Sequence, residues 1–189
     1  SRVIVALLLT LPFSLAAVAI APIEKQSEQT ALYREILDRL ATRHYRGQEI
    51  NDELSARYLS TYIEMLDPLK SYFLAADIND FSQWQTTLDD LASRGDVTPG
   101  FYMFNRLRDR MLGQLQANIE LLESDYEFDY SVDEVIVLDG EDRQWMQSAE
   151  QQRDYWRKRI KDSMIRLLIN DKEPEKAREL LIKRFNNQI

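Results

Sequence analysis

The feature that most constrains the fold is an apolar repeat over residues 99–122, which lasts for about seven helical turns. Apolar side chains recur there every three or four residues: Phe101, Phe104, Leu107, Met111, Leu115, Ile119 and Leu122. This spacing is that of one face of an α-helix. Thr98 suits the N-cap of such a helix and Pro99 its first position. It is the longest helix that the sequence predicts.

Five further helices are predicted from apolar spacing and from residues that begin or end helices. Their predicted beginnings are Ser27 or Thr30, Asn51 and Asp77 as N-caps, Ser148 with Gln151 as a capping box, and Pro174. Gly47 and Pro68 are predicted to end the first and second of these helices. Only five Gly and five Pro occur in 189 residues, which favours helices over a turn-rich β fold. The sequence therefore predicts an all-α domain of about six helices.

Two apolar stripes predict which helix faces lie in the core. In the first helix, the stripe includes Leu32 and Ile36 and continues to His44. In the third, one continuous helix from Asp77 is expected to carry its stripe as far as Leu91.

Residues 124–142 depart from the helical pattern. They hold eight acidic residues and no basic one, and Tyr126, Phe128 and Tyr130 alternate with acids. Alternation predicts a short extended stretch within an irregular acidic insert. A calcium loop over residues 129–133 is the functional alternative, but Gly at the sixth loop position and Glu at the twelfth are absent. We expect a solvated acidic loop anchored by its aromatic side chains.

The connection between the second and third helices is unusually apolar. Within LDPLKSYFLAADINDF, residues 66–81, Pro68 is followed by Tyr72, Phe73 and Leu74 without helical spacing. We predict that residues 68–74, called the plug below, fill the core between two helices. Lys70 within the plug is predicted to be solvated.

The first residues predict export. Arg2 precedes an unbroken apolar run, residues 3–21, which ends in small residues and contains two A-x-A sites. These features describe a secretory signal peptide. Cleavage after Ala19 is preferred, because cleavage after Ala21 leaves Pro22 at the new N-terminus. The alternative is a retained membrane anchor, since the run is just long enough to span a bilayer.

The predicted division is a signal peptide over residues 1–19 and a helical domain over residues 20–189. The sequence lacks an initiating Met, and a helical pattern continues almost to its last residue. We therefore expect a piece of a longer exported protein.

No catalytic, cofactor-binding or metal-binding residue is predicted. The sequence has one His and no Cys, whereas a structural zinc site needs four such ligands and a catalytic site usually three. His44, on the apolar face of the first helix, is predicted to be a packed residue. Neither a Gly-rich phosphate loop nor a G-x-S-x-G turn occurs.

Nucleic acid is not an expected partner. The formal net charge is −8, whereas nucleic-acid binding requires a basic face. Residues 153–161, RDYWRKRIK, interleave cations with aromatics as single-strand binders do, but their spacing predicts a helix with a solvated basic face. Contact with a membrane is expected only through the N-terminal signal segment.

Several short motifs together resemble a known family. They are His44-Tyr45, Leu66-Asp67, Tyr72-Phe73-Leu74, Asp77 with Phe81, DRQW at residues 142–145 and YWRKRIK at residues 155–161. In this order they resemble the N-terminal domain of the tail-specific proteases, the carboxy-terminal processing peptidases of Gram-negative bacteria. The resemblance covers roughly residue 32 to the C-terminus.

The resemblance implies chemistry that lies outside these residues. Full-length relatives are periplasmic and continue into a PDZ domain, which captures substrate C-termini, and a protease domain with a Ser nucleophile and a Lys general base. The implied partners are these downstream domains, protein substrates with apolar C-termini and a periplasmic adaptor. None of the Ser–Lys constellation lies in this chain, so no catalytic position is transferred to it.

The expected role is that of an accessory domain that governs substrate access or adaptor docking. Met103 and Met111 are expected to add adaptable apolar surface to the long helix for such a partner. The alternative is an autonomous exported helical module that acts as an adaptor or chaperone. A longer reading frame that encodes PDZ and Ser–Lys domains would favour the accessory domain, whereas an early stop codon would favour the module.

Overall fold

The computed structural model describes residues 21–24, 26–43 and 51–189. In this part of the chain the elements are α1 (Ser27–Arg43), α2 (Asp52–Leu66), α3 (Ala75–Phe81), the 3₁₀ turn η1 (Ser82–Trp84), α4 (Leu88–Ser93), α5 (Thr98–Glu123), α6 (Ala149–Ile169) and α7 (Pro174–Asn186). The all-α prediction is confirmed. One more α-helix than expected is present, because the predicted third helix is interrupted.

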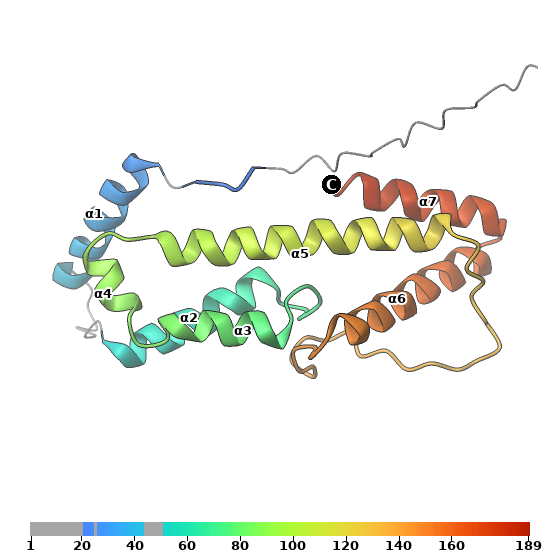
Figure 1. The fold of residues 1–189 in the computed structure, drawn as a ribbon, viewed down its shortest axis with the longest axis horizontal. Coiled ribbons are helices and arrows are strands. Elements are labelled where there is room, and N and C mark those ends of the chain that lie inside the picture. Colours follow the sequence, from blue (N-terminus) through green and yellow to red (C-terminus); the bar gives the residue numbers. More distant parts are fainter. Residues whose placement is uncertain (1–20, 25, 44–50) are drawn as a thin grey trace, which may run out of the picture.

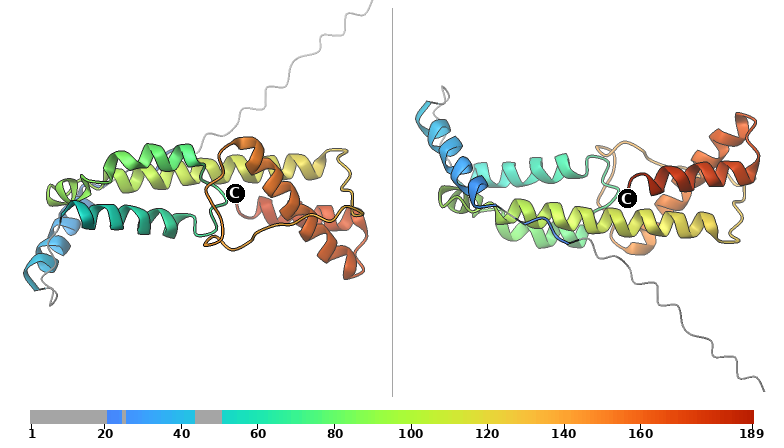
Figure 2. Two further views of the ribbon diagram at one scale, coloured as in Figure 1. Left: turned by 90° about the horizontal axis from the view of Figure 1, so that it is seen from below. Right: turned by 90° about the horizontal axis from the view of Figure 1, so that it is seen from above.

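Helix α5 is the spine of the molecule (Figure 1). Its 26 residues make it about 39 Å long. Helices α2 and α3 lie along its N-terminal half, and α6 and α7 lie towards its C-terminal half (Figures 1 and 2). Helix α7 runs back antiparallel to α5, and α1 lies at the far end beside α4. Two groups of helices therefore share one long helix.

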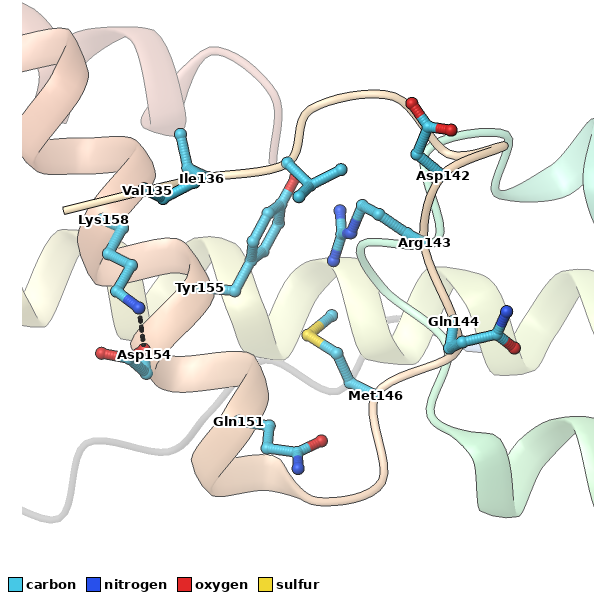
Figure 3. Close-up of a pocket in the computed structure, with 11 residues that line it drawn as sticks. Val135, Ile136, Asp142, Arg143, Gln144, Met146, Gln151, Asp154, Tyr155 and Lys158 are labelled. Carbon is cyan, nitrogen blue, oxygen red and sulfur yellow. Dashed lines mark ion pairs between the residues drawn. The ribbon is translucent and has the colours of Figure 1, made fainter.

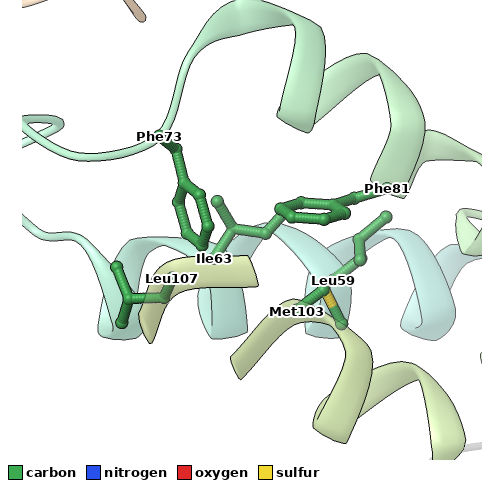
Figure 4. Close-up of a cluster of buried hydrophobic side chains, with 6 residues drawn as sticks. All are labelled: Leu59, Ile63, Phe73, Phe81, Met103 and Leu107. Carbon is green, nitrogen blue, oxygen red and sulfur yellow. The ribbon is translucent and has the colours of Figure 1, made fainter. Parts of the chain in front are cut away.

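Three clusters of buried apolar side chains form the core. The first cluster, between α2, α3 and the N-terminal half of α5, consists of Leu59, Ile63, Phe73, Phe81, Met103 and Leu107 (Figure 4). The second cluster, at the other end of α5, consists of Leu122, Phe128, Ile160, Met164, Ala177 and Leu181. The third cluster joins the plug to α6 and consists of Leu74, Met146, Tyr155 and Trp156.

Capping residues predicted several helix beginnings. Asn51 accepts a hydrogen bond from the Leu54 amide at 3.0 Å, and Ser148 accepts one from the Gln151 amide at 3.2 Å. Pro174 is the first residue of α7. These three beginnings are confirmed, as is the end of α2 before Pro68.

Two predicted N-caps are wrong. The N-cap of α3 is Leu74, and Asp77 lies three residues further on, where its carboxylate accepts a hydrogen bond from the Leu74 amide at 2.9 Å. A carboxylate can bind a free amide from this position in the first turn as well as from the cap. The N-cap of α5 is Val97, one residue before Thr98.

The predicted continuous helix from Asp77 to Leu91 is also wrong. The chain leaves the helix after Phe81, forms η1 and re-enters a helix at Leu88. At this break the Ser82 hydroxyl donates to the Asn79 carbonyl at 2.6 Å. Polar side chains that bond to the backbone in this way compete with the helical pattern.

Two residues of the apolar stripe predicted for α1 do not lie in the core. Leu32 and Ile36 are exposed, because α1 lies at the end of the molecule rather than along α5 (Figure 1). His44 and Gly47 lie outside the described residues, so their predicted roles are not addressed by the structure. None of the described helices is both long and apolar enough to cross a membrane.

The expected partner surface on α5 is wrong for Met103, whereas for Met111, which is only partly buried, it stays a prediction. Met103 is buried in the first cluster, and Met111 is packed against it. The part of the α5 face that carries Met103 is covered by side chains of α2, α3 and the plug.

Candidate functional site

A single buried carboxylate organises the plug. Asp67 follows the last residue of α2, and its oxygens accept hydrogen bonds from the amides of Ser71, Tyr72 and Phe73 at 2.9, 2.8 and 2.9 Å. Pro68 cannot continue the helix, so the chain turns back, and the carboxylate binds amides that would otherwise be left unpaired. The sharp turn is a local consequence of Asp67-Pro68.

This turn directs Phe73 into the first cluster. The ring is 0% exposed and packs edge-on against Phe81, with ring centroids 5.2 Å apart (Figure 4). The prediction that the plug fills the core is confirmed. Lys70 is not simply solvated, because its Nζ donates to the Arg143 carbonyl at 2.8 Å.

The end of the acidic insert, together with Arg143 directly after it, packs against the plug. Arg143 Nη1 donates to the Leu69 carbonyl at 2.9 Å, and its guanidinium carbon lies 3.6 Å from the ring centroid of Tyr155. At Gly140 the two segments approach so closely that a Cβ atom would lie 1.9 Å from the carbonyl oxygen of Pro68. Only glycine fits this contact without a shift of the backbone.

Helix α6 holds the plug from a further side. Trp156 Nε1 donates to the Ser71 carbonyl at 3.0 Å, and Gln152 Nε2 donates to the Tyr72 carbonyl at 2.7 Å. These bonds pair the carbonyl groups of Ser71 and Tyr72, which lie in an irregular turn beside the core and would otherwise be costly to bury. The plug is therefore fixed by α2, by the insert and by α6 together.

A separate contact fastens the middle of the insert to α6. Glu134 forms ion pairs with Arg157 and with Lys161, the latter at 2.8 Å. Hydrogen bonds from Arg157 and Lys161 lower the pKa of Glu134 from 4.5 to about 2. The carboxylate therefore stays charged at neutral pH. The Lys161 ammonium also donates to the Val132 carbonyl at 2.8 Å.

The structure corrects two predictions about the insert and α6. The basic face of residues 153–161 is only partly solvated, because the acidic insert folds back onto it. Of the three aromatic residues in the insert, Phe128 is buried in the second cluster, while Tyr126 and Tyr130 are exposed. The Phe128 ring and the Glu134 carboxylate are therefore two of the anchors of the insert.

Between these contacts, the insert and α6 border a hollow of about 360 Å³ (Figure 3). Residues 135–137 line one side of the hollow, and Asp142, Arg143, Gln144 and Met146 line another side. The side chains of Tyr155 and Arg143 lie side by side between these two sides. Lys158 and Asp154, ion-paired at 2.7 Å, also line it. Among the described residues, those that line the hollow combine apolar side chains of the insert with charged and amide side chains.

The described residues contain no group of three or more His, Asp or Glu side chains placed to hold a metal ion. Asp129, which the calcium alternative would use, accepts hydrogen bonds from the Ser131 amide and hydroxyl. That the chain carries no catalytic, cofactor-binding or metal-binding residue stays a prediction.

Comparison with known proteins decides the family. The family model described as the tail-specific protease N-terminal domain matches residues 36–189. The chain belongs to this family. A tail-specific protease of Haemophilus influenzae is 29% identical over 152 residues, which are 80% of this chain and 22% of that protein. The chain thus corresponds to less than a quarter of that relative, and the resemblance drawn from the short motifs is confirmed.

In this tail-specific protease N-terminal domain, several motif residues hold the fold together. Asp67 organises the plug, Arg143 closes over it and Trp156 pairs a buried carbonyl. His44-Tyr45 lies outside the described residues. The described motifs therefore have architectural roles.

Asp77, another motif residue, fastens α3 to α5. Its carboxylate, 1% exposed, forms ion pairs with Arg106 at 2.8 Å and Arg110 at 2.9 Å. Burial alone would raise the pKa of Asp77, but hydrogen bonds from Arg110, the Leu74 amide and Arg106 lower it below its usual value. The sequence did not reveal this site, although two arginines four residues apart on one helix share a face.

Proposed function

We propose that this chain is the accessory helical domain of a periplasmic serine endopeptidase of the Ser–Lys type. That enzyme processes or degrades proteins from their C-termini, and its substrates carry apolar C-terminal residues. Downstream PDZ and protease domains supply tail capture and peptide-bond cleavage. Residues 1–19 act as the signal peptide for export. The observation that carries the proposal is the family match over residues 36–189.

Within such an enzyme, this domain governs substrate access or adaptor docking. The buried motif residues are used for the domain's own fold, whereas large apolar side chains remain on its surface. Tyr58 and Met65 on α2 are 61% and 72% exposed, and Val135 in the insert is 86% exposed. Tyr58 and Met65 are seven residues apart on α2 and therefore share one face, and exposed apolar side chains on one face are typical of surfaces that meet a partner.

Deletion of residues 20–189 from the full-length enzyme tests this role. Cleavage of a short peptide is expected to survive, because the chemistry resides downstream. Degradation of a folded protein, or its dependence on an adaptor, is expected to be lost. The matched control is the full-length enzyme with Gly113→Ala, at a helix position with no atom within 4 Å of an added Cβ. If a stably folded deletion variant keeps both activities, the domain has no role in access or docking.

A further inference from the structure

We infer that residues 133–138 of the insert form a docking edge for an extended polypeptide strand with basic and β-branched apolar side chains. This inference names the surface for the proposed docking role and rests on that role for its biological meaning. The binding itself is measurable on this chain alone.

The side chains of this segment alternate in exposure as those of a β-strand do. Residues 133–139 contain no turn or bend, and the insert runs back along α6 (Figure 1). Exposed Asp133, Val135 and Val137 alternate with partly buried Glu134 and Ile136. A period of two is that of a β-strand, whose side chains point to opposite faces.

The two inward side chains hold the segment straight. Glu134 is ion-paired to Arg157 and Lys161 on α6, and Ile136 packs against the third cluster. A segment that is already extended loses less conformational freedom when a second strand pairs with it. The docking edge is therefore preorganised.

The peptide groups of the docking edge are available for pairing. Within the described part of the chain, residues 133–139 form no backbone–backbone hydrogen bond. An extended segment with a row of unpaired amide and carbonyl groups is a template for an added strand.

Exposed apolar side chains give the edge a second means of recognition. Val135 has the largest exposed fraction among the large apolar residues described, and Val137 and Leu138 are exposed beside it. The hollow of Figure 3 adjoins residues 135–137 and has room for side chains of an added strand. Cross-strand apolar pairs of this kind stabilise a sheet.

The charge of the insert determines which kind of strand the docking edge is expected to bind. Eight acidic residues lie in residues 124–142 with no basic one, and of these eight only Glu134 forms an ion pair within the described residues. A second copy of this chain, paired through the same edge, would bring two acidic inserts together, which is unfavourable. A strand with Lys or Arg between its apolar residues has the complementary charge.

Binding of short blocked peptides to the 189-residue chain tests the edge. The probes are a peptide of alternating Val and Lys, the same peptide with alternate amides N-methylated, and a peptide of alternating Val and Glu. The Val–Lys peptide is expected to bind, and N-methylation is expected to raise its dissociation constant by at least about tenfold. Binding should also weaken between 0.1 and 1 M salt, where the Debye length falls from about 10 to about 3 Å. The Val–Glu peptide is expected not to bind.

Variants of the chain locate the site. Val135→Pro removes one amide but tolerates an extended backbone, and it is expected to weaken the Val–Lys peptide by at least about tenfold. Val135→Ile keeps the amide, the β-branch and the apolar side chain and should bind like the parent chain. Ile169→Ala, at the exposed end of α6, is the control for an apolar residue elsewhere. Unchanged helical circular dichroism shows that each variant is folded.

Three results would overturn the inference: equal binding of the N-methylated peptide, equal binding of the Val–Glu peptide, or no binding of the Val–Lys peptide. The outcome is separable from that of the proposed function. If the Val–Lys peptide binds but the deletion changes no activity, the docking edge is confirmed and its role in adaptor docking is excluded. If the deletion abolishes adaptor dependence but the Val–Lys peptide does not bind, the domain has the docking role, and another of its surfaces performs it.

Discussion

At the scale of single residues, buried carboxylates determine how the irregular parts of this fold are built. Asp67 binds three successive amides of the plug, and Asp77 binds the N-terminal amide of α3 and two arginines of α5. A buried carboxylate is tolerated only when such partners replace its water. Both residues therefore fix a turn and a helix contact that apolar packing alone would leave ambiguous.

The deepest residue of the plug gives the first prediction. Phe73→Ala is expected to lower the free energy of unfolding by about 3–5 kcal/mol, because it leaves a cavity in the first cluster. Tyr58→Ala, at an exposed site of α2, should change it by less than about 0.5 kcal/mol. Urea unfolding followed by circular dichroism measures both. Equal midpoints for the two variants would contradict the burial of Phe73.

Two glycines give a paired prediction of opposite sign. Gly140→Ala should destabilise by about 1–3 kcal/mol, because its Cβ would lie 1.9 Å from the Pro68 carbonyl oxygen. Gly113→Ala lies inside α5, with no neighbouring atom within 4 Å of the new Cβ. It should stabilise by about 0.5–1 kcal/mol, since alanine favours a helix interior. The thermal midpoints of the two variants should therefore shift in opposite directions.

At the scale of elements, the sequence predicts what is decided locally. Asn51, Ser148 and Pro174 mark helix beginnings because each acts on amides within its own first turn. The break after Phe81 escaped prediction, because the apolar spacing continues across it. The path of the insert could not be predicted either. It depends on Glu134 meeting Arg157 and Lys161, more than twenty residues away, and such a pairing has no local signature.

The contact between the insert and α6 predicts a dependence on pH. Because the pKa of Glu134 is lowered from 4.5 to about 2 in the folded chain, its stabilising effect is fully present above about pH 4.5. It is lost as the pH falls towards about 2. Glu134→Gln should therefore be less stable than the parent chain by about 1–3 kcal/mol near neutral pH. The difference should vanish near pH 2.

Urea midpoints of both proteins across this pH range measure the effect. Glu127→Gln in the same insert is the control, since Glu127 is exposed and has no ion pair among the described residues. A difference between Glu134→Gln and the parent that is constant with pH would mean that the ion pairs do not hold the insert.

At the scale of the whole molecule, α5 links two cores that would otherwise be separate. Met103 and Leu107 near its beginning belong to the first cluster, and Leu122 near its end belongs to the second. Leu115 and Ile119 between them are also buried. The third cluster adds a second link, because it joins the plug to α6. If either group of helices unfolds, buried surface of α5 is exposed, and the other group also packs against α5.

This arrangement predicts that the molecule unfolds as one unit. Ile160→Ala removes a buried side chain from the second cluster and should destabilise by about 2–5 kcal/mol. In native-state hydrogen exchange, the most protected amides of α2, in the other group of helices, should lose protection by the same factor as those of α7. Ile169→Ala on the same helix, at a site that is 75% exposed, should leave both unchanged. If Ile160→Ala lowers protection in α6 and α7 while α2 keeps its own, the two groups unfold separately, and α5 connects them without coupling their stability.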